Sequence, residues 1–337
     1  MIGTESGGRN NLFSAESVKF GGTLGSLIQK INDLGVKFGI WIEPEMISED
    51  SDLYREHPDW ALTIPGRNPV HARNQLVLDF SRKEVVDHIF DQICKVLDQG
   101  NIEYVKWDMN RSLMDVFSRG TKDQGRVVYD YVIGLYDFLE RIVTRYPDLL
   151  IEGCSDNTDA LDRLQIQYGT SFGYPISAVG SHVSAVPNHQ TGRITSLHTR
   201  GVVAMAGTFG YELNLGKLSE EEKEEIRSQV EEYRKFAPLI QTGLYYRLSD
   251  PSKEEYAAWA FVSEDQKEVL LNVVMQEIHE NMTVNYVNLQ GLKCSAVYRD
   301  TETGKTYNGA ALMEAGIPMP VEMGEFKAYQ MHLVGEE

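Results

Sequence analysis

Hydrophobic and polar positions follow two different periods along the first two thirds of the chain. In some segments apolar residues recur every three to four positions, as in a helix with one buried face, and in others they form short runs, as in a buried strand. The helical period predicts helices over 23–34, 82–98, 126–146 and 157–164. The short runs predict strands over 36–42, 76–79, 103–107, 149–153, 165–170 and 201–206. This alternation is typical of parallel βαβ units.

The pattern changes after the acidic segment 219–232. This segment is predicted to be an exposed helix, opened by a capping box in which Ser219 and Glu222 satisfy each other's backbone groups. Beyond it, short alternating strands separated by turn residues are predicted over 256–275, 283–298 and 325–334. We therefore predict two domains, an α/β barrel over 1–248 and a small antiparallel β domain over 249–337.

Polar side chains stand at the ends of three of the predicted strands. The segments are VKFGIWIEPE at 36–45, EYVKWDMNR at 103–111 and LLIEGCSD at 149–156. In a parallel α/β barrel the active site lies at the carboxyl ends of the strands. Three strands with polar side chains at the same end favour an active site over simple helix caps. Asp108 is thereby a candidate nucleophile, with helix capping as its alternative interpretation.

Composition and charge narrow the range of partners. The chain has 337 residues, of which 42% are hydrophobic and 24% charged, so it can bury a substantial core. A net charge of −18 argues against nucleic acid or an anionic membrane as a partner.

The cysteines and the lack of targeting signals add to this picture. The three cysteines, at 94, 154 and 294, are widely spaced and predict neither a disulfide framework nor a zinc site. The sequence contains no apolar run of membrane-spanning length and no signal peptide. We expect a cytoplasmic protein without a metal site.

Four longer motifs connect the predicted strand ends to a known family. They are KFGIWIEPEMISEDSDLYREHPDW at 37–60, YVKWDMNR at 104–111, SDNTDALDRLQIQYGTS at 155–171 and GSHVSAVPNHQTGR at 180–193. With these motifs the chain resembles the α-galactosidases of glycoside hydrolase family 36 over most of residues 25–250. The resemblance implies a (β/α)8 TIM-type barrel followed by a C-terminal β-sandwich. It also implies retaining hydrolysis of terminal α-galactosides such as melibiose and raffinose, through a covalent galactosyl-enzyme and without metal or cofactor.

The same resemblance assigns roles to individual positions. It implies Asp108 as the nucleophile and Asp156 as the general acid/base. The sugar-pocket residues that it implies are Trp41, Arg73, Lys106, Asn110 and Cys154. A retaining mechanism needs two carboxyl groups about 5–5.5 Å apart, so the fold has to bring Asp108 and Asp156 to one rim. We expect Lys106 to keep Asp108 ionised, and ionised Asp108 to raise the pKa of Asp156.

Several of these positions also have a purely structural interpretation. Asp156 precedes a predicted helix and could cap it, which would lower its pKa. Arg73 could pair with Asp79 or Glu45 for stability alone. Trp41 could be a core residue of its strand.

The chain departs from the family pattern in three places. Beside the family pattern, we expect it to be without the N-terminal β domain, an Asp-Asp-Gly-Trp-Phe-Gly strand motif, and a glycine-rich loop after Cys154-Ser155. We therefore expect a barrel that is incomplete at its N-terminus. A truncated copy, a partner chain that completes the barrel, and segments outside this sequence are all open explanations.

Two other functions stay open beside hydrolysis. One is a degenerate, non-catalytic homologue that binds sugar, and the other is a galactosyl transferase of the raffinose-synthase type. The expected partner is an α-galactoside oligosaccharide, and analogy with the family suggests a homo-oligomer.

Overall fold

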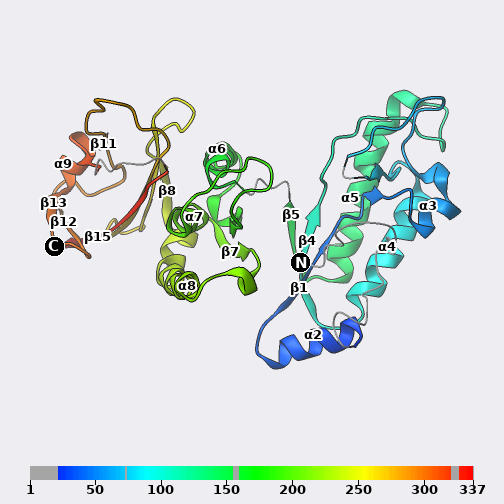
Figure 1. Ribbon diagram of the computed structural model, residues 1–337, viewed down its shortest axis with the longest axis horizontal. Helices are drawn as coiled ribbons and strands as arrows, with labels where there is room; N and C mark the ends of the chain where they lie inside the picture. The colour runs from blue at the N-terminus through cyan, green and yellow to red at the C-terminus, as the bar shows by residue number, and fades with distance from the viewer. Residues whose placement is uncertain (1–21, 73, 155–158, 320–325, 337) are drawn as a thin grey trace. The chain divides into compact units, whose positions relative to one another are not determined.

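The chain forms two compact units in the computed structural model, residues 1–156 and 157–337. The structure describes residues 22–72, 74–154, 159–319 and 326–336, and many of their helices and strands are labelled in Figure 1. Each unit buries hydrophobic clusters of its own.

A parallel three-stranded sheet forms the centre of the first unit. Its strands lie in the order β1 (Phe38–Ile42), β4 (Ile102–Asp108), β5 (Leu150–Cys154). The register places Trp41 opposite Lys106, and Lys106 opposite Glu152. Because the strands are parallel, their carboxyl ends meet at one edge of the sheet. The three predicted strands of this sheet are confirmed, and their polar ends come together as expected.

Helices α4 (Lys83–Leu97) and α5 (Val127–Arg145) pack against one face of this sheet (Figure 1). Their apolar residues, three and four positions apart, share a core with strand residues that point the same way. This shared core includes Val85, Val86, Ile89, Ile93, Val105, Trp107, Phe138 and Ile142. Burying each such large side chain stabilises the fold by about 1.5–3 kcal/mol. Helix α2 (Leu24–Asp33), capped by Thr23, packs Ile28 against Val96.

Short elements and polar networks connect the strands to these helices. The short elements are β2 (Met46–Ile47), α3 (Asp52–Glu56), β3 (Leu76–Val77) and single 3-10 turns at Pro58–Trp60 and Gln124–Arg126.

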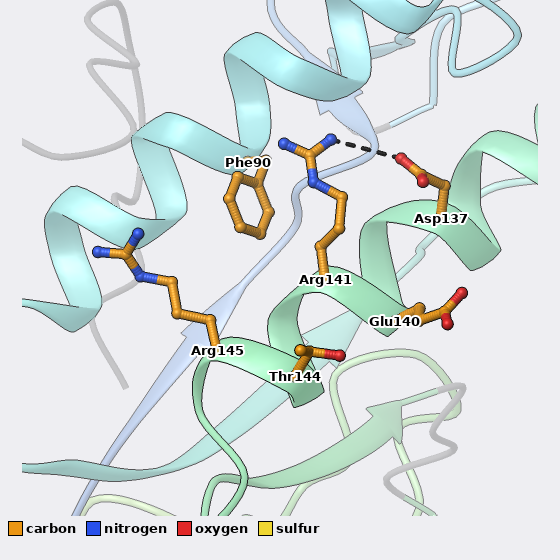
Figure 2. Close-up of a pocket in the computed structure, with 6 residues that line it drawn as sticks. All are labelled: Phe90, Asp137, Glu140, Arg141, Thr144 and Arg145. Atoms are coloured by element: carbon orange, nitrogen blue, oxygen red, sulfur yellow. Dashed lines mark hydrogen bonds and ion pairs between the residues drawn. The ribbon is translucent and has the colours of Figure 1, made fainter.

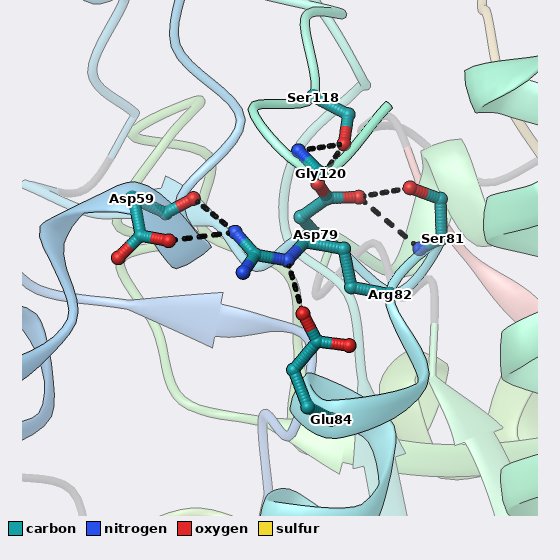
Figure 3. A network of polar contacts seen from close by, with 7 residues as sticks. All are labelled: Asp59, Asp79, Ser81, Arg82, Glu84, Ser118 and Gly120. Carbon is teal, nitrogen blue, oxygen red and sulfur yellow. Dashed lines mark hydrogen bonds and ion pairs between the residues drawn. The ribbon is translucent and has the colours of Figure 1, made fainter. Parts of the chain in front are cut away.

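A network of hydrogen bonds and ion pairs holds the residues that precede α4. The buried Asp79 accepts a hydrogen bond from Ser118 (Figure 3). Arg82 donates to Asp59 and to Glu84, each at 2.8 Å. The hydrogen bond from Arg82 holds the pKa of Asp59 below its usual value.

The second unit begins with an α/β segment. Its parallel strands β6 (Gly180–Ser184) and β7 (Thr208–Glu212) pair along their full length. Helices α6, α7 and α8 share its hydrophobic clusters, and their bounds are Ala160–Thr170, Leu197–Ala204 and Glu220–Thr242. Two 3-10 turns, Ile176–Ala178 and Leu215–Lys217, lie in the connections. The predicted capping box of the acidic helix is confirmed.

An antiparallel six-stranded sheet makes up most of the rest of the second unit. Its order is β13-β12-β15-β10-β9-β8, and the strands span Leu244–Arg247 (β8), Tyr256–Val262 (β9), Glu268–Met275 (β10), Val297–Asp300 (β12), Thr306–Asn308 (β13) and Ala328–Glu336 (β15). A two-stranded sheet, β11 (Tyr286–Val287) with β14 (Ile317–Pro318), and helix α9 (Gly309–Glu314) complete it. Alternate residues of β9 and β10 enter different cores, one shared with α8 and one with β11, β14 and α9. Both faces of these central strands are therefore covered.

Two predicted strands are wrong in this unit. Residues 165–170 are not a strand, because they lie within α6, which spans Ala160–Thr170. Residues 201–206 are not a strand either. Residues 201–204 form the last turn of the buried helix α7, and 205–206 lie in the turn after it. The run at 201–206 is buried on all sides, so it has no periodicity that separates helix from strand. The strands of this segment are instead β6 and β7.

Candidate active site

The polar residues at the strand ends share one face of the β1-β4-β5 sheet. Along β4, Val105 and Trp107 enter the core beneath α4 and α5, so alternation turns Lys106 and Asp108 to the opposite face. Trp41 of β1 lies on that face too, because its indole Nε1 donates a hydrogen bond to Asp108 Oδ2 at 3.0 Å. Side chains from different strands therefore meet on the face away from these helices.

The two carboxylate oxygens of Asp108 have different surroundings. The side chain is buried, and Oδ2 accepts hydrogen bonds from Trp41 Nε1 at 3.0 Å and Asn110 Nδ2 at 2.6 Å. Oδ1 is also buried but has no hydrogen-bond partner among the residues that the structure describes. A buried carboxylate oxygen without a partner is costly, and in a native protein it calls for a functional explanation.

Asn110 connects Asp108 to a second buried carboxylate, that of Glu43. Its Nδ2 donates to Asp108 Oδ2 and to Glu43 Oε1, each at 2.6 Å. Because ionised carboxylates only accept hydrogen bonds, the nitrogen of the amide has to face both of them. The other oxygen of Glu43 accepts from Gln75 Nε2 at 3.0 Å. Neither Glu43 nor Gln75 was among the predicted site residues, although the exit of β1 marks the position of Glu43.

Lys106 makes an ion pair on the same face of the sheet. Its Nζ lies 3.7 Å from Glu152 Oε1 on β5, and Tyr104 donates to the other oxygen of Glu152. Lys106 is only 9% exposed, so its charge is held inside the protein two positions from Asp108. Glu152 was not predicted as a site residue, and its place opposite Lys106 in the register is the signal that identifies it. The expected effect of Lys106 on the ionisation of Asp108 stays a prediction.

The loop after β4 holds the segment 70–75. Arg111 donates through its two Nη atoms to the backbone oxygens of Gln75 and Val70, the second at 2.8 Å. Asp115 accepts a hydrogen bond from the Val70 N–H at 2.6 Å. These contacts fix the described residues on both sides of position 73.

Of the predicted site residues, two lie outside the described residues and a third is described by its backbone alone. Arg73 and Asp156 lie outside the described residues. Cys154 is the last residue of β5, where its backbone is in register with Asp108, but its side chain is not described. The roles expected for these three residues stay predictions.

Glu45, a structural partner suggested for Arg73, belongs to the core on the helix side of the sheet. It is 4% exposed and accepts hydrogen bonds from Trp107 Nε1 at 2.9 Å and from the Tyr131 hydroxyl. Burial, with the charge of Glu45 beside it, raises the pKa of Tyr131. Glu45 and Glu43 are therefore two buried carboxylates of one segment that serve different networks.

The helix that follows the motif at 155–159 is capped by Asp159. Its side chain accepts from the Leu161 N–H at 3.0 Å, at the start of α6. Thr191 Oγ1 at 2.6 Å and Arg193 Nη1 at 2.5 Å bind the same carboxylate. Burial raises the pKa of Asp159, but these hydrogen bonds outweigh burial and hold the pKa below its usual value.

A further polar group lies in the motif at 180–193. His182 Nε2 on β6 is 2.9 Å from Glu212 Oε2 on β7 and 3.2 Å from Arg163 Nη2 on α6. Gln167 Nε2 of the same helix donates to Ser181 Oγ at 2.8 Å. The group ties α6 to the β6-β7 pair, which is a structural role.

An open hollow of about 500 Å³ lies on α4 and α5 (Figure 2). Arg141 stacks on the Phe90 ring, with its Cζ 3.9 Å from the centroid, and pairs with Asp87 at 2.8 Å. The residues that line it are Phe90, Asp137, Glu140, Arg141, Thr144 and Arg145. None of them belongs to the group around Asp108.

A metal site and a membrane-spanning helix are both absent from the residues that the structure describes. No three His, Cys, Asp or Glu side chains in that part of the chain form a group that could hold a metal ion. Within the same residues, no helix combines the length and the apolar character that a membrane crossing requires.

Comparison with family models identifies the family. The model named Melibiase matches residues 11–156 and 155–243, and that of the glycosyl hydrolase family 36 C-terminal domain matches 256–333. The chain belongs to glycoside hydrolase family 36. The predicted family is thereby confirmed, and with it the fold class of an α/β barrel followed by an antiparallel β domain.

Named family 36 proteins are similar over nearly the whole chain. The bifunctional alpha-galactosidase/sucrose kinase AgaSK of Mediterraneibacter gnavus is 57% identical over 94% of this chain, and alpha-galactosidase Mel36A of Lactobacillus acidophilus is 45% identical over 93%. The chain spans only 36% and 46% of the length of these two relatives.

Solved family 36 structures share the fold. The galactosidase domain of AgaSK aligns with a TM-score of 0.87 at 57% identity. The alpha-galactosidase AgaB of Geobacillus stearothermophilus aligns with a TM-score of 0.88 at 42% identity. Each alignment covers 95% of this chain and 47% of the other.

Proposed function

We propose that this chain carries the catalytic site of a retaining α-galactosidase, with Asp108 as the nucleophile. The observation that carries this proposal is the difference between the two oxygens of Asp108. Oδ2 is held by Trp41 and Asn110, whereas Oδ1 is buried and has no hydrogen-bond partner among the described residues. A carboxylate nucleophile needs a fixed orientation and one oxygen available for attack, because near-attack geometry governs the rate.

The reaction then follows double displacement. Asp108 Oδ1 attacks the anomeric carbon while the bond from that carbon to the leaving oxygen breaks, and a second carboxyl group protonates the leaving oxygen. We assign this second role to Asp156. In the next step the Asp156 carboxylate takes a proton from water, whose oxygen attacks the anomeric carbon and releases Asp108.

The proposed substrates are terminal α-galactosides of the melibiose and raffinose type. In support, variants of the Geobacillus stearothermophilus α-galactosidase AgaA, 42–43% identical to this chain, were crystallised with raffinose and with stachyose. The residues that we propose as sugar contacts are Trp41, Arg73, Lys106, Asn110 and Cys154. Trp41 and Lys106 support this assignment by sharing the sheet face of Asp108.

We also predict the location, the assembly and the domain boundary of this protein. They are a cytoplasmic location, assembly as a homo-oligomer, and a domain boundary between residues 248 and 249. The retaining stereochemistry is likewise a prediction, since it depends on the separation of Asp108 from Asp156.

Initial rates of aryl α-galactoside hydrolysis test the proposal. We expect the purified protein to turn over the substrate and Asp108→Asn to lose activity about a thousandfold or more, with an unchanged thermal unfolding midpoint. NMR should detect α-galactose as the first product. Turnover that survives in Asp108→Asn, or none from the folded wild-type protein, would contradict the function. β-Galactose as the first product would contradict retention.

A further inference from the structure

We propose that Glu43 is a positioning residue, which acts on the nucleophile through Asn110. The inference rests on the proposed role of Asp108. Glu43 follows β1, is 8% exposed, and binds Asn110 through one oxygen at 2.6 Å and Gln75 through the other at 3.0 Å. It therefore joins the exit of β1 to the loop after β4 and to the end of segment 70–75.

The chemistry of Asn110 explains why this link matters. The Asn110 Nδ2 bridges Glu43 Oε1 and Asp108 Oδ2, each at 2.6 Å, so the bridge involves one carboxylate at each end. Hydrogen bonds to carboxylates are charge-assisted and about twice as strong as neutral ones. With Glu43 in place, the Asn110 amide has one favourable orientation. Without it, the amide can flip or turn away from Asp108.

The orientation of Asn110 in turn decides which oxygen of Asp108 is available. The terminal torsion of an aspartate is broad and nearly two-fold, so its two oxygens exchange easily unless their partners differ. Donors from Trp41 and Asn110 converge on Oδ2 and leave Oδ1 as the oxygen without a partner among the described residues. By holding Asn110, Glu43 helps to keep Oδ1 in the attacking position.

Glu45 provides a matched control in the same segment. It is as well buried as Glu43, at 4% against 8% exposed, and both of its oxygens accept hydrogen bonds. Its partners, Trp107 and Tyr131, belong to the helix-packed core. A loss of activity that follows merely from disturbing a buried glutamate would therefore appear in both positions.

The test is a double-mutant cycle on aryl α-galactoside hydrolysis. Glu43→Gln keeps the side-chain volume, so we expect it to fold, but its neutral amide cannot give Asn110 the charge-assisted hydrogen bond that the carboxylate accepts. We expect kcat to fall about tenfold with KM within about twofold, because the positioning and not the binding of the sugar is affected. Asn110→Ala should lose about ten- to hundredfold, and the double variant should lose no more than Asn110→Ala alone. Glu45→Gln should lower the unfolding midpoint but retain the kcat of the folded protein.

Each contrary result has a separate meaning. Losses that multiply in the double variant would overturn the action through Asn110, and an unchanged kcat in Glu43→Gln would overturn the positioning role. An equal loss of kcat in Glu45→Gln would show that replacing any buried glutamate of this segment lowers activity, and would contradict a specific role of Glu43. If Glu43→Gln lacks a cooperative unfolding transition, Glu43→Asp replaces it, with the same expected loss of kcat at unchanged KM. Wild-type protein without Asp108-dependent turnover would instead refute the proposed function itself.

Discussion

Trp41 and Asn110 share one task at the residue scale, since each donates a hydrogen bond to the same oxygen of Asp108. They approach from different parts of the chain, Trp41 along the strand β1 and Asn110 from the loop that follows β4. The result is a carboxylate with one constrained oxygen and one without a partner among the described residues. This asymmetry is the local basis of the proposed nucleophile.

Replacement of Trp41 by phenylalanine tests this constraint. Trp41→Phe keeps an aromatic ring but removes the N–H that donates to Asp108 Oδ2. We expect kcat/KM for an aryl α-galactoside to fall about ten- to hundredfold, because the orientation of the nucleophile is loosened. The thermal unfolding midpoint should move little. Unchanged kcat/KM would show that the indole N–H does not orient Asp108.

Part of the site could be predicted from the sequence and part could not. Trp41, Lys106 and Asn110 were predicted, because strand ends and family motifs identify them without any knowledge of side-chain contacts. The network that supports them was not predicted, because Glu43 reaches Gln75 across 32 positions and Asn110 across 67. Such pairings depend on the register of β1 with β4 and on loop conformation, which residue patterns do not specify.

At the scale of elements, a buried hydroxyl of α5 adds a polar contact between this helix and the segment that follows β1. Tyr131 donates to Glu45, and both side chains are almost fully buried. We expect Tyr131→Phe to lower the free energy of unfolding by about 1–3 kcal/mol, because it leaves a buried carboxylate oxygen without a donor. Tyr129→Phe is the matched control, since Tyr129 lies on the same helix but is 63% exposed. Urea unfolding that gives equal losses for both variants would contradict this account.

Helix α6 should show a pH-dependent contribution from its cap. The folded-state pKa of Asp159 is held below its ordinary value of 3.8, so the charged form stabilises the fold above that pH and this contribution is lost as the pH falls below it. Asp159→Asn keeps a capping side chain but loses the charge that Arg193 binds. The difference in unfolding free energy between wild type and variant should therefore be largest near neutral pH and shrink below about pH 4. A difference that stays constant well below that pH would contradict the assignment.

The elements themselves were predictable where the pattern was long. α2, α4 and α5 appear at the predicted places, because each repeats its apolar stripe over several turns. The strands predicted at 165–170 and 201–206 are wrong, because 165–170 is the last part of the helix α6 and 201–206 is a fully buried run at the end of α7. The strands β6 and β7 escaped prediction, because segments such as GSHVS carry too few apolar residues for a strand pattern.

At the scale of the whole molecule, the proposed mechanism depends on two carboxyl groups that are 48 positions apart in the sequence, Asp108 and Asp156. If Asp156 is the general acid, Asp156→Ala should slow melibiose or raffinose far more than an activated aryl α-galactoside, whose leaving group needs no proton. Parallel kcat/KM measurements on both substrate types check this. Equal losses on both would remove Asp156 from the acid role.

The central claim, that Asp108 attacks the anomeric carbon, is tested most directly by azide rescue of Asp108→Ala. This variant leaves space beside the sugar for a small anion to attack in place of the carboxylate. We predict that azide restores turnover of an aryl α-galactoside in Asp108→Ala and that the product of this variant is β-galactosyl azide. Asp156→Ala, which keeps the nucleophile, should not form β-galactosyl azide. Absence of rescue, or formation of α-galactosyl azide by Asp108→Ala, would contradict Asp108 as the nucleophile.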